Sequence, residues 1–145
     1  MIAVDTNLLV YAHRGETPFH EAASRALADL IETGAQWAIP WPCVHEFLAV
    51  VTNARIFKPP TPVNTALEAT RRWLDSPTLI TLAETERHWN QLVTIVAAGR
   101  VAGPMVHDAR IAALCLEHGV TELWTADRDF SRFPQLKVRN PLVAR

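Results

Sequence analysis

Glycine is scarce in this sequence, with five among 145 residues, and none of the five falls in a GxGxxG or GxxxxGK[ST] pattern. In those patterns, glycine lets the backbone approach a phosphate group closely. Their absence argues against dinucleotide and nucleoside-triphosphate binding in their usual forms. A phosphate group bound by this protein would have to be held in another way, such as through a metal ion.

Cysteine is also rare. Cys43 and Cys115 are far apart and both lie in apolar, helix-like segments, so we expect buried, reduced thiols rather than a disulfide or zinc framework, and a reducing compartment. A zinc site built from Cys43, His45, His107 and Cys115 is a minor alternative, because its spacing matches no common zinc pattern.

Long apolar runs and a basic, leader-like N-terminus are missing, and so are low-complexity stretches and repeats. Apolar residues make up 49% and charged residues 20%, which is typical of a globular domain. We therefore expect a cytoplasmic protein with no membrane contact, in which residues 1–145 fold as a single domain.

An excess of either charge is absent as well, because the formal net charge is −1 and the sequence pI is about 6.6. A uniformly basic face for a polyanion is not supported, so nucleic acid is neither implied nor excluded. Trp37, Trp73 and Trp124 are expected in a core or interface rather than on a base-stacking surface.

Short apolar runs alternate with longer segments of helical spacing. We expect strands near residues 2–4, 37–39, 79–82 and 122–125, and an edge strand in the tail between residues 136 and 142. Helices are expected at 17–31, 42–51, 61–74, 84–98 and 103–118, with Thr-Pro or Gly-Pro pairs opening three of them. Parallel strands need long crossovers, so the predicted class is a three-layer α/β/α fold with a mainly parallel central sheet.

Two acidic residues come directly after predicted strands. Asp5 follows Ile2-Ala3-Val4, and Asp127 follows Leu123-Trp124-Thr125-Ala126. Residues just past the carboxyl ends of parallel strands line the ligand crevice, so both side chains should reach one site. Glu46, in an apolar helix, and Asp108, in the first turns of an alanine-rich helix, are two further candidates.

Each acid also has a structural interpretation. Asp5 can cap a helix, Asp127 can form an Asx-turn with Asp129, and Asp108 is favourable near a helix N-terminus. For Glu46, the small and apolar neighbours make a solvated position difficult. These roles do not explain why all four acids fall at one edge of the sheet.

A cluster of carboxylates needs a compensating cation, because two of them about 4 Å apart repel by about 4 kcal/mol at an effective dielectric constant of 20. Hard oxygen ligands without a Cys/His set suit Mg²⁺ or Mn²⁺ better than Zn²⁺. Such a site is suited to phosphodiester hydrolysis by metal-activated water.

The chain resembles the PIN-domain ribonucleases, and within them the toxin component of VapBC-type toxin-antitoxin modules. The resemblance is carried by four segments in order: Asp5-Thr6-Asn7-Leu8-Leu9-Val10-Tyr11-Ala12, Glu46-Phe47, Asp108-Ala109-Arg110-Ile111-Ala112-Ala113, and Thr125-Ala126-Asp127-Arg128-Asp129-Phe130. It extends from Ile2 into the tail.

The resemblance implies a homodimeric endoribonuclease that depends on Mg²⁺ or Mn²⁺ and is blocked by a VapB-type antitoxin. Asp5 and Asp108 then match the main metal ligands, and Glu46 and Asp127 complete the catalytic acidic quartet. Three residues are expected to support them: Asn7, Thr125 and Asp129. RNA contacts would come from local cations, with Arg14, Arg55, Lys58, Arg110, Arg128 and Arg132 as candidates.

Three other interpretations stay open. A metal-dependent DNA or flap nuclease shares the chemistry and differs in substrate. A catalytically silent module would bind metal and a protein partner without turnover. A receiver-like phosphoacceptor domain needs a lysine beside the acids, and Lys58 and Lys137 are poorly placed for that role.

Overall fold

The computed structural model describes residues 1–143 of the chain. The strands are β1 (Ile2–Val4), β2 (Trp37–Pro40), β3 (Leu79–Leu82), β4 (Glu122–Trp124) and β5 (Val138–Arg139). The helices are α1 (Thr6–His13), α2 (His20–Glu32), α3 (Trp41–Val51), α4 (Val63–Leu74), α5 (His88–Gly99) and α6 (Val106–Glu117). Two 3₁₀ turns, η1 (Gly103–Met105) and η2 (Arg128–Arg132), complete the set.

All five strands pair in parallel, in the order β3-β2-β1-β4-β5. The central strand β1 sets the register, with Ala3 opposite Ala38 on one side and Leu123 on the other. Helices cover both faces, so the inner strands are largely buried on both sides. Strands β1 and β2 are apolar throughout, whereas β4 begins with the buried Glu122. The predicted α/β fold class is confirmed.

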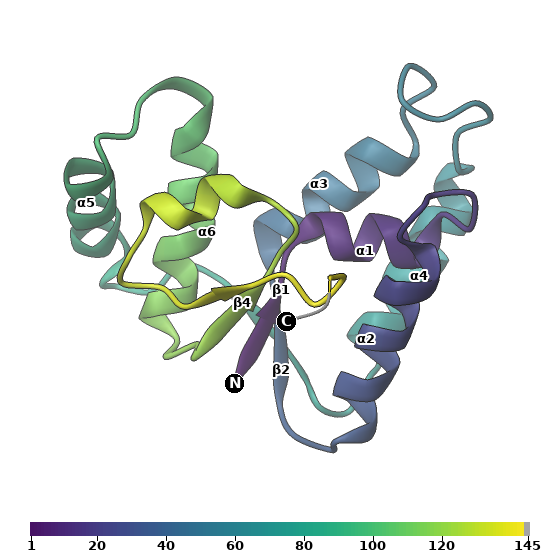
Figure 1. The fold of residues 1–145 in the computed structure, drawn as a ribbon, viewed down its shortest axis with the longest axis horizontal. Helices are drawn as coiled ribbons and strands as arrows, with labels where there is room; N and C mark the ends of the chain where they lie inside the picture. Colours follow the sequence, from purple (N-terminus) through teal and green to yellow (C-terminus); the bar gives the residue numbers. More distant parts are fainter. Residues whose placement is uncertain (144–145) are drawn as a thin grey trace.

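The direction of the crossovers places the helices. Right-handed connections from β1 to β2 and from β2 to β3 put α1–α4 on one face, and the return from β3 to β4 puts α5 and α6 on the other. Figure 1 shows α5 and α6 together on one side of the sheet, with α1, α2 and α4 on the opposite side.

The sheet has a topological switch point between β1 and β4. The chain leaves β1 toward β2 and leaves β4 toward β5, in opposite directions across the sheet. In open parallel sheets, ligands bind at the carboxyl ends of the strands at such a point. Asp5 follows β1 and Thr125 follows β4, so both lie at this position.

The core lies on both sides of β1. Trp37 and Phe47 are fully buried, and the Phe47 ring packs edge-on against Trp73 with 4.9 Å between centroids. Trp124 is also buried, and Trp73 is partly buried against the core, which is compatible with the core or interface position predicted for the three tryptophans. Cys43 and Cys115 are buried free thiols, as expected. Within residues 1–143, no helix combines the length and apolar character that a membrane crossing requires.

The main error in the predicted elements is the segment after Asp5. The sequence predicts no helix before residue 17, but this segment contains α1, whose N-cap is Asp5. Several helices also begin later than predicted: α2 begins at His20, α4 at Val63 and α5 at His88. The predicted edge strand in the tail is confirmed as β5, parallel to β4.

Candidate active site

Asp5 is the most enclosed acid of the site. It is 5% exposed, and its Oδ1 accepts a 2.8 Å hydrogen bond from the backbone N–H of Thr6, which caps α1. The Cys43 thiol donates to the same oxygen at 3.5 Å. These contacts fix the carboxylate at the end of β1, so the helix-capping role and a role in the site coexist.

Two neighbouring side chains hold the other oxygen of Asp5. The Thr125 hydroxyl donates to Oδ2 at 2.7 Å, and the Asn7 side-chain amide reaches Oδ2 at 3.4 Å and the Thr125 hydroxyl at 3.1 Å. Asn7 also accepts from the backbone N–H of Ala126. This network joins the ends of β1 and β4, and it involves both Asn7 and Thr125, which were expected to support the site.

Glu46 lies on α3 and faces the same region. The Thr6 hydroxyl donates to its Oε2 at 3.2 Å. Contrary to the expectation that α3 leaves this carboxylate poorly solvated, Glu46 is exposed. The apolar neighbours Val44 and Phe47 point into the core, whereas Glu46 is on the side of the helix that faces the cavity.

Three other acids meet across the switch point. One carboxylate oxygen from each of Asp108, Asp127 and Asp129 lies within 4.8 Å of the other two, close enough to share one cation. Asp108 comes from the first turn of α6, and the other two come from η2 and its N-cap. Asp127 accepts from the backbone N–H of Asp129 at 2.8 Å, so the predicted Asx-turn is also present.

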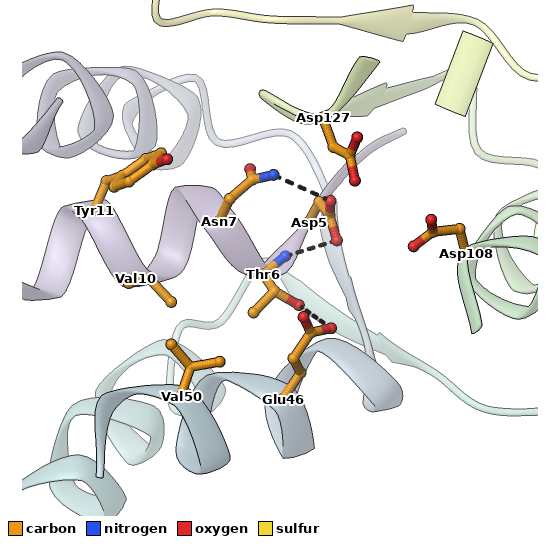
Figure 2. Close-up of a pocket in the computed structure, with 9 residues that line it drawn as sticks. All are labelled: Asp5, Thr6, Asn7, Val10, Tyr11, Glu46, Val50, Asp108 and Asp127. Carbon is orange, nitrogen blue, oxygen red and sulfur yellow. Dashed lines mark hydrogen bonds between the residues drawn. The ribbon is translucent and has the colours of Figure 1, made fainter. Parts of the chain in front are cut away.

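A cavity of about 210 Å³ connects these groups. Asp5, Glu46, Asp108 and Asp127 all line it, together with Thr6, Asn7, Val10, Tyr11 and Val50. Figure 2 shows the carboxylates of Glu46, Asp108 and Asp127 around Asp5. The four acids come from α3, α6 and the chain segments after β1 and β4. The structure thus places the four predicted acids around one cavity, with Asp129 beside Asp127. Asp5 and Glu46 are outside the group of three whose oxygens lie within 4.8 Å of one another.

The electrostatics of the cavity disfavour several negative charges at once. Burial, together with the negative charges of Asp127, Asp5, Asp129 and Glu46, raises the pKa of Asp108 to about 6. Burial also raises the pKa of Asp5, although hydrogen bonds from Thr125, Thr6 and Cys43 oppose the increase. A bound cation would remove this repulsion.

The donor set fits Mg²⁺ or Mn²⁺. The groups that face one another are carboxylates, which are the hard oxygen ligands these ions prefer. The alternative zinc site of Cys43, His45, His107 and Cys115 is not formed. Among residues 1–143, the His, Cys, Asp and Glu side chains close enough to share one ion are Asp108, Asp127 and Asp129. Cys43 and Cys115 are also fully buried.

Sequence reasoning missed three residues at this site: Thr6, Cys43 and Tyr11. Thr6 orients Glu46, Cys43 contacts Asp5, and Tyr11 lines the cavity. Thr6 could have been found as a hydroxyl residue directly after Asp5. The contact made by Cys43 depends on the packing of α3 and has no local sequence signal.

Comparison with known proteins shows which family this chain belongs to. A family model described as the PIN domain matches residues 2–136. The chain belongs to the PIN-domain family. Among curated PIN relatives, ribonuclease VapC43 of Mycobacterium tuberculosis is 36% identical over 142 residues, which cover 98% of this chain and 96% of the relative.

Solved structures share the PIN fold at lower identity. VapBC2 from Rickettsia felis, bound to a DNA fragment from its promoter, aligns with a TM-score of 0.72 and 18% identity over 97% of this chain and 98% of that one. VapC20 of Mycobacterium tuberculosis, described as a sarcin-ricin-loop-cleaving toxin, aligns with a TM-score of 0.69 and 17% identity over 90% of this chain and 93% of that one. Their likeness to this PIN domain is in the fold.

Proposed function

We propose that this protein is a Mg²⁺- or Mn²⁺-dependent endoribonuclease that acts in the cytoplasm as the toxin of a type II toxin-antitoxin system. The observation that carries the proposal is the single cavity lined by Asp5, Glu46, Asp108 and Asp127 at the switch point of a PIN fold. The 36% identity with ribonuclease VapC43 over nearly the whole chain supports RNA as the substrate.

In this proposal, Asp5, Glu46, Asp108 and Asp127 are the metal ligands and catalytic acids. Asn7, Thr125 and Asp129 support them: Asn7 and Thr125 hold Asp5, and Asp129 adds a carboxylate to the Asp108–Asp127 pair. A bound divalent ion would activate water and stabilise the charge that develops on the phosphate oxygens.

Two threonine hydroxyl groups hold the acids in position. Thr6 orients the Glu46 carboxylate, and the Thr125 hydroxyl both donates to Asp5 and accepts from the backbone N–H of Asp127, so it fixes the spacing of two acids. Such outer hydrogen bonds typically change metal affinity or activity by about 10- to 100-fold when removed.

A VapB-type antitoxin is the proposed protein partner, and a homodimer the proposed assembly of the toxin. The support for the antitoxin comes from solved neighbours of this fold described as VapBC complexes, from Rickettsia felis and from Salmonella typhimurium. A small gene beside the coding sequence, whose product co-purifies with this protein and suppresses its nuclease activity, is the expected observation.

The decisive experiment is cleavage of a mixed RNA pool by the purified protein. We expect cleavage with Mg²⁺ or Mn²⁺, none with EDTA, and a loss of at least about 100-fold in Asp108→Asn prepared in the same way. A folded Asp108→Asn protein with unchanged cleavage would contradict the assignment. A matched DNA pool separates the alternative DNA or flap nuclease, and metal binding without turnover on either pool would favour the silent module.

A further inference from the structure

A second cavity of about 520 Å³ lies beside the acidic one, between α3 and α6. Glu46 and Asp108 line both cavities, so the two are continuous at this pair of acids. The second cavity, which we call the α3–α6 groove, is lined by Pro42, His45, Glu46, Ala49, Pro104, His107, Asp108, Arg110 and Ile111.

The two cavities differ in charge. The nine residues around the acidic cavity include four carboxylates and no arginine, lysine or histidine. The α3–α6 groove adds His45 from one wall, and His107 and Arg110 from the other. This places hydrogen-bond donors beside the acids, among them the Arg110 guanidinium, which is ion-paired with Glu84.

Arg110 is held in position at the groove. Its Nη2 and Nε donate to Glu84 Oε1 at 2.6 and 3.1 Å, and Glu84 lies in the segment before α5. The guanidinium group has five N–H donors, and these two bonds leave others available. It can therefore contact a phosphate group while Glu84 fixes its orientation.

The sizes of the cavities indicate what each can hold. Pockets that enclose small organic ligands measure about 300–1,000 Å³. The acidic cavity, at about 210 Å³, is below that range, whereas the groove is within it. A phosphate and its metal suit the smaller space, and a whole nucleotide suits the larger one.

We propose that the α3–α6 groove binds the nucleotide next to the scissile phosphate, with His45 and His107 contacting its base and Arg110 its phosphate. Unstacked RNA bases are commonly recognised by histidine and arginine side chains through stacking and hydrogen bonds. His45 also lies near the Trp41 ring, at 6.3 Å between centroids, so an aromatic surface continues from the groove wall. This inference rests on the proposed ribonuclease function and assigns a base-recognition role to two residues outside the acid cluster.

The test measures RNA binding without catalysis. A fluorescently labelled single-stranded RNA of mixed sequence is titrated with the full-length protein in EDTA, and binding is followed by anisotropy. We expect His45→Ala/His107→Ala to weaken binding by at least about 10-fold, in line with the contribution of base contacts. Arg110→Gln should weaken binding and lower the salt dependence by about one phosphate contact.

Two controls separate this role from a structural or metal-binding one. His118→Ala removes a histidine at the far end of α6, whose Nε2 lies 2.7 Å from the Ala83 carbonyl oxygen, and it should bind RNA as the unmodified protein does. Arg71→Gln removes an exposed arginine on α4 and should retain the full salt dependence. All variants should keep the rise in melting temperature produced by Mn²⁺.

The proposal is overturned if the double histidine variant binds RNA as tightly as His118→Ala, or if the unmodified protein binds no RNA in EDTA. Loss of the Mn²⁺ effect in the histidine variant would assign these residues to the metal site and overturn it as well. Should the double variant not fold, Arg110→Gln and each single histidine variant decide the question. Failure of the ribonuclease function appears separately, as absence of metal-dependent cleavage by the unmodified protein.

Discussion

Thr125 has a single hydroxyl group that serves three neighbours. It donates to Asp5 at 2.7 Å and accepts from the Asn7 amide and from the backbone N–H of Asp127. The side chain is 1% exposed, so water cannot replace these bonds easily. Its loss should therefore affect both stability and metal binding.

We predict that Thr125→Val, which keeps the shape and removes the hydroxyl, lowers the free energy of unfolding by about 1–3 kcal/mol. Mn²⁺ affinity should fall by about 10- to 100-fold. Urea unfolding and calorimetric titration measure the two effects. Thr125→Ser retains the hydroxyl and should recover most of the metal affinity; a serine variant as weak as the valine variant would contradict this role.

Asp108 should destabilise the metal-free protein. Its pKa is raised to about 6 in the folded state, so above that pH the folded protein contains a carboxylate less stable than in the unfolded chain. Asp108→Asn should raise the free energy of unfolding in EDTA at pH 7 by about 1 kcal/mol, after allowance for solvent screening. In thermal unfolding this corresponds to a rise of about 2–4 °C.

Bound metal should make the unmodified protein more stable than Asp108→Asn, the reverse of the order expected in EDTA. At about 100 times its dissociation constant, a single bound ion stabilises the unmodified protein by about 2.7 kcal/mol. The variant should show little of this gain. A melting curve of Asp108→Asn that lies below the unmodified protein in EDTA, and moves equally with Mn²⁺, would remove Asp108 from the metal site.

At the scale of elements, Glu117 joins the end of α6 to the start of α5. Its carboxylate lies 2.6 Å from His88 Nδ1, and it accepts from the backbone N–H and the hydroxyl of Thr85. Burial raises the pKa of Glu117, but these hydrogen bonds lower it by more, so the net shift is downward.

This shift gives a pH dependence of stability. A carboxyl group with a depressed folded pKa contributes its stability above the unfolded value of 4.5 and loses it as the pH falls through the folded pKa. We expect Glu117→Gln to cost about 2 kcal/mol at pH 7, and the difference from the unmodified protein to shrink below pH 4.5. Urea unfolding across pH 3–7 measures it; a difference that grows on acidification would contradict the assignment.

Phe47 connects three helices on the other face of the sheet. It lies on α3, packs against Trp73 of α4, and meets the His13 ring of α1 edge-on at 5.4 Å. Phe47→Ala should cost about 3–5 kcal/mol because it leaves a cavity, and Phe47→Leu clearly less. Denaturant unfolding measures the free energy of unfolding of both variants. Equal decreases would show that the surrounding residues move in to fill the space left by the alanine.

Most elements could be predicted from sequence because their apolar residues recur at a regular spacing, or because glycine or proline marks their ends. Helix α1 could not, because three consecutive residues, Leu8, Leu9 and Val10, are all buried. A short helix packed against both α2 and α3 is apolar on most sides, so its sequence shows no 3.6-residue period. Helices α2 and α4 begin later than predicted because Thr17 and Thr61 do not cap them. The Thr17 hydroxyl donates to the carbonyl of Arg14, and the Thr61 hydroxyl bonds to the side chains of His13 and Arg14.

At the scale of the whole molecule, the acidic cavity was predictable because sheet topology determines it. Strand ends in a parallel sheet meet at one edge, and this alone brings Asp5 and Asp127 together. The exposure of Glu46 and the α3–α6 groove were not predictable. Both depend on the distance between α3 and α6, which lie on opposite faces of the sheet. His45 and His107 are 62 positions apart in the chain, and nothing near either residue indicates that they line the same groove.

The hydrogen bond between Thr125 and Asp5 joins residues 120 positions apart, across the two central strands of the sheet. During synthesis, β1 leaves the ribosome before β4. The two strands can pair only after the residues between them have been made, at about 5–20 residues per second. An incomplete nascent chain therefore lacks Thr125 and Asp127 and has no assembled site. A ribonuclease built in this order cannot attack the messenger or the ribosome that is producing it until the chain through Asp127 has emerged.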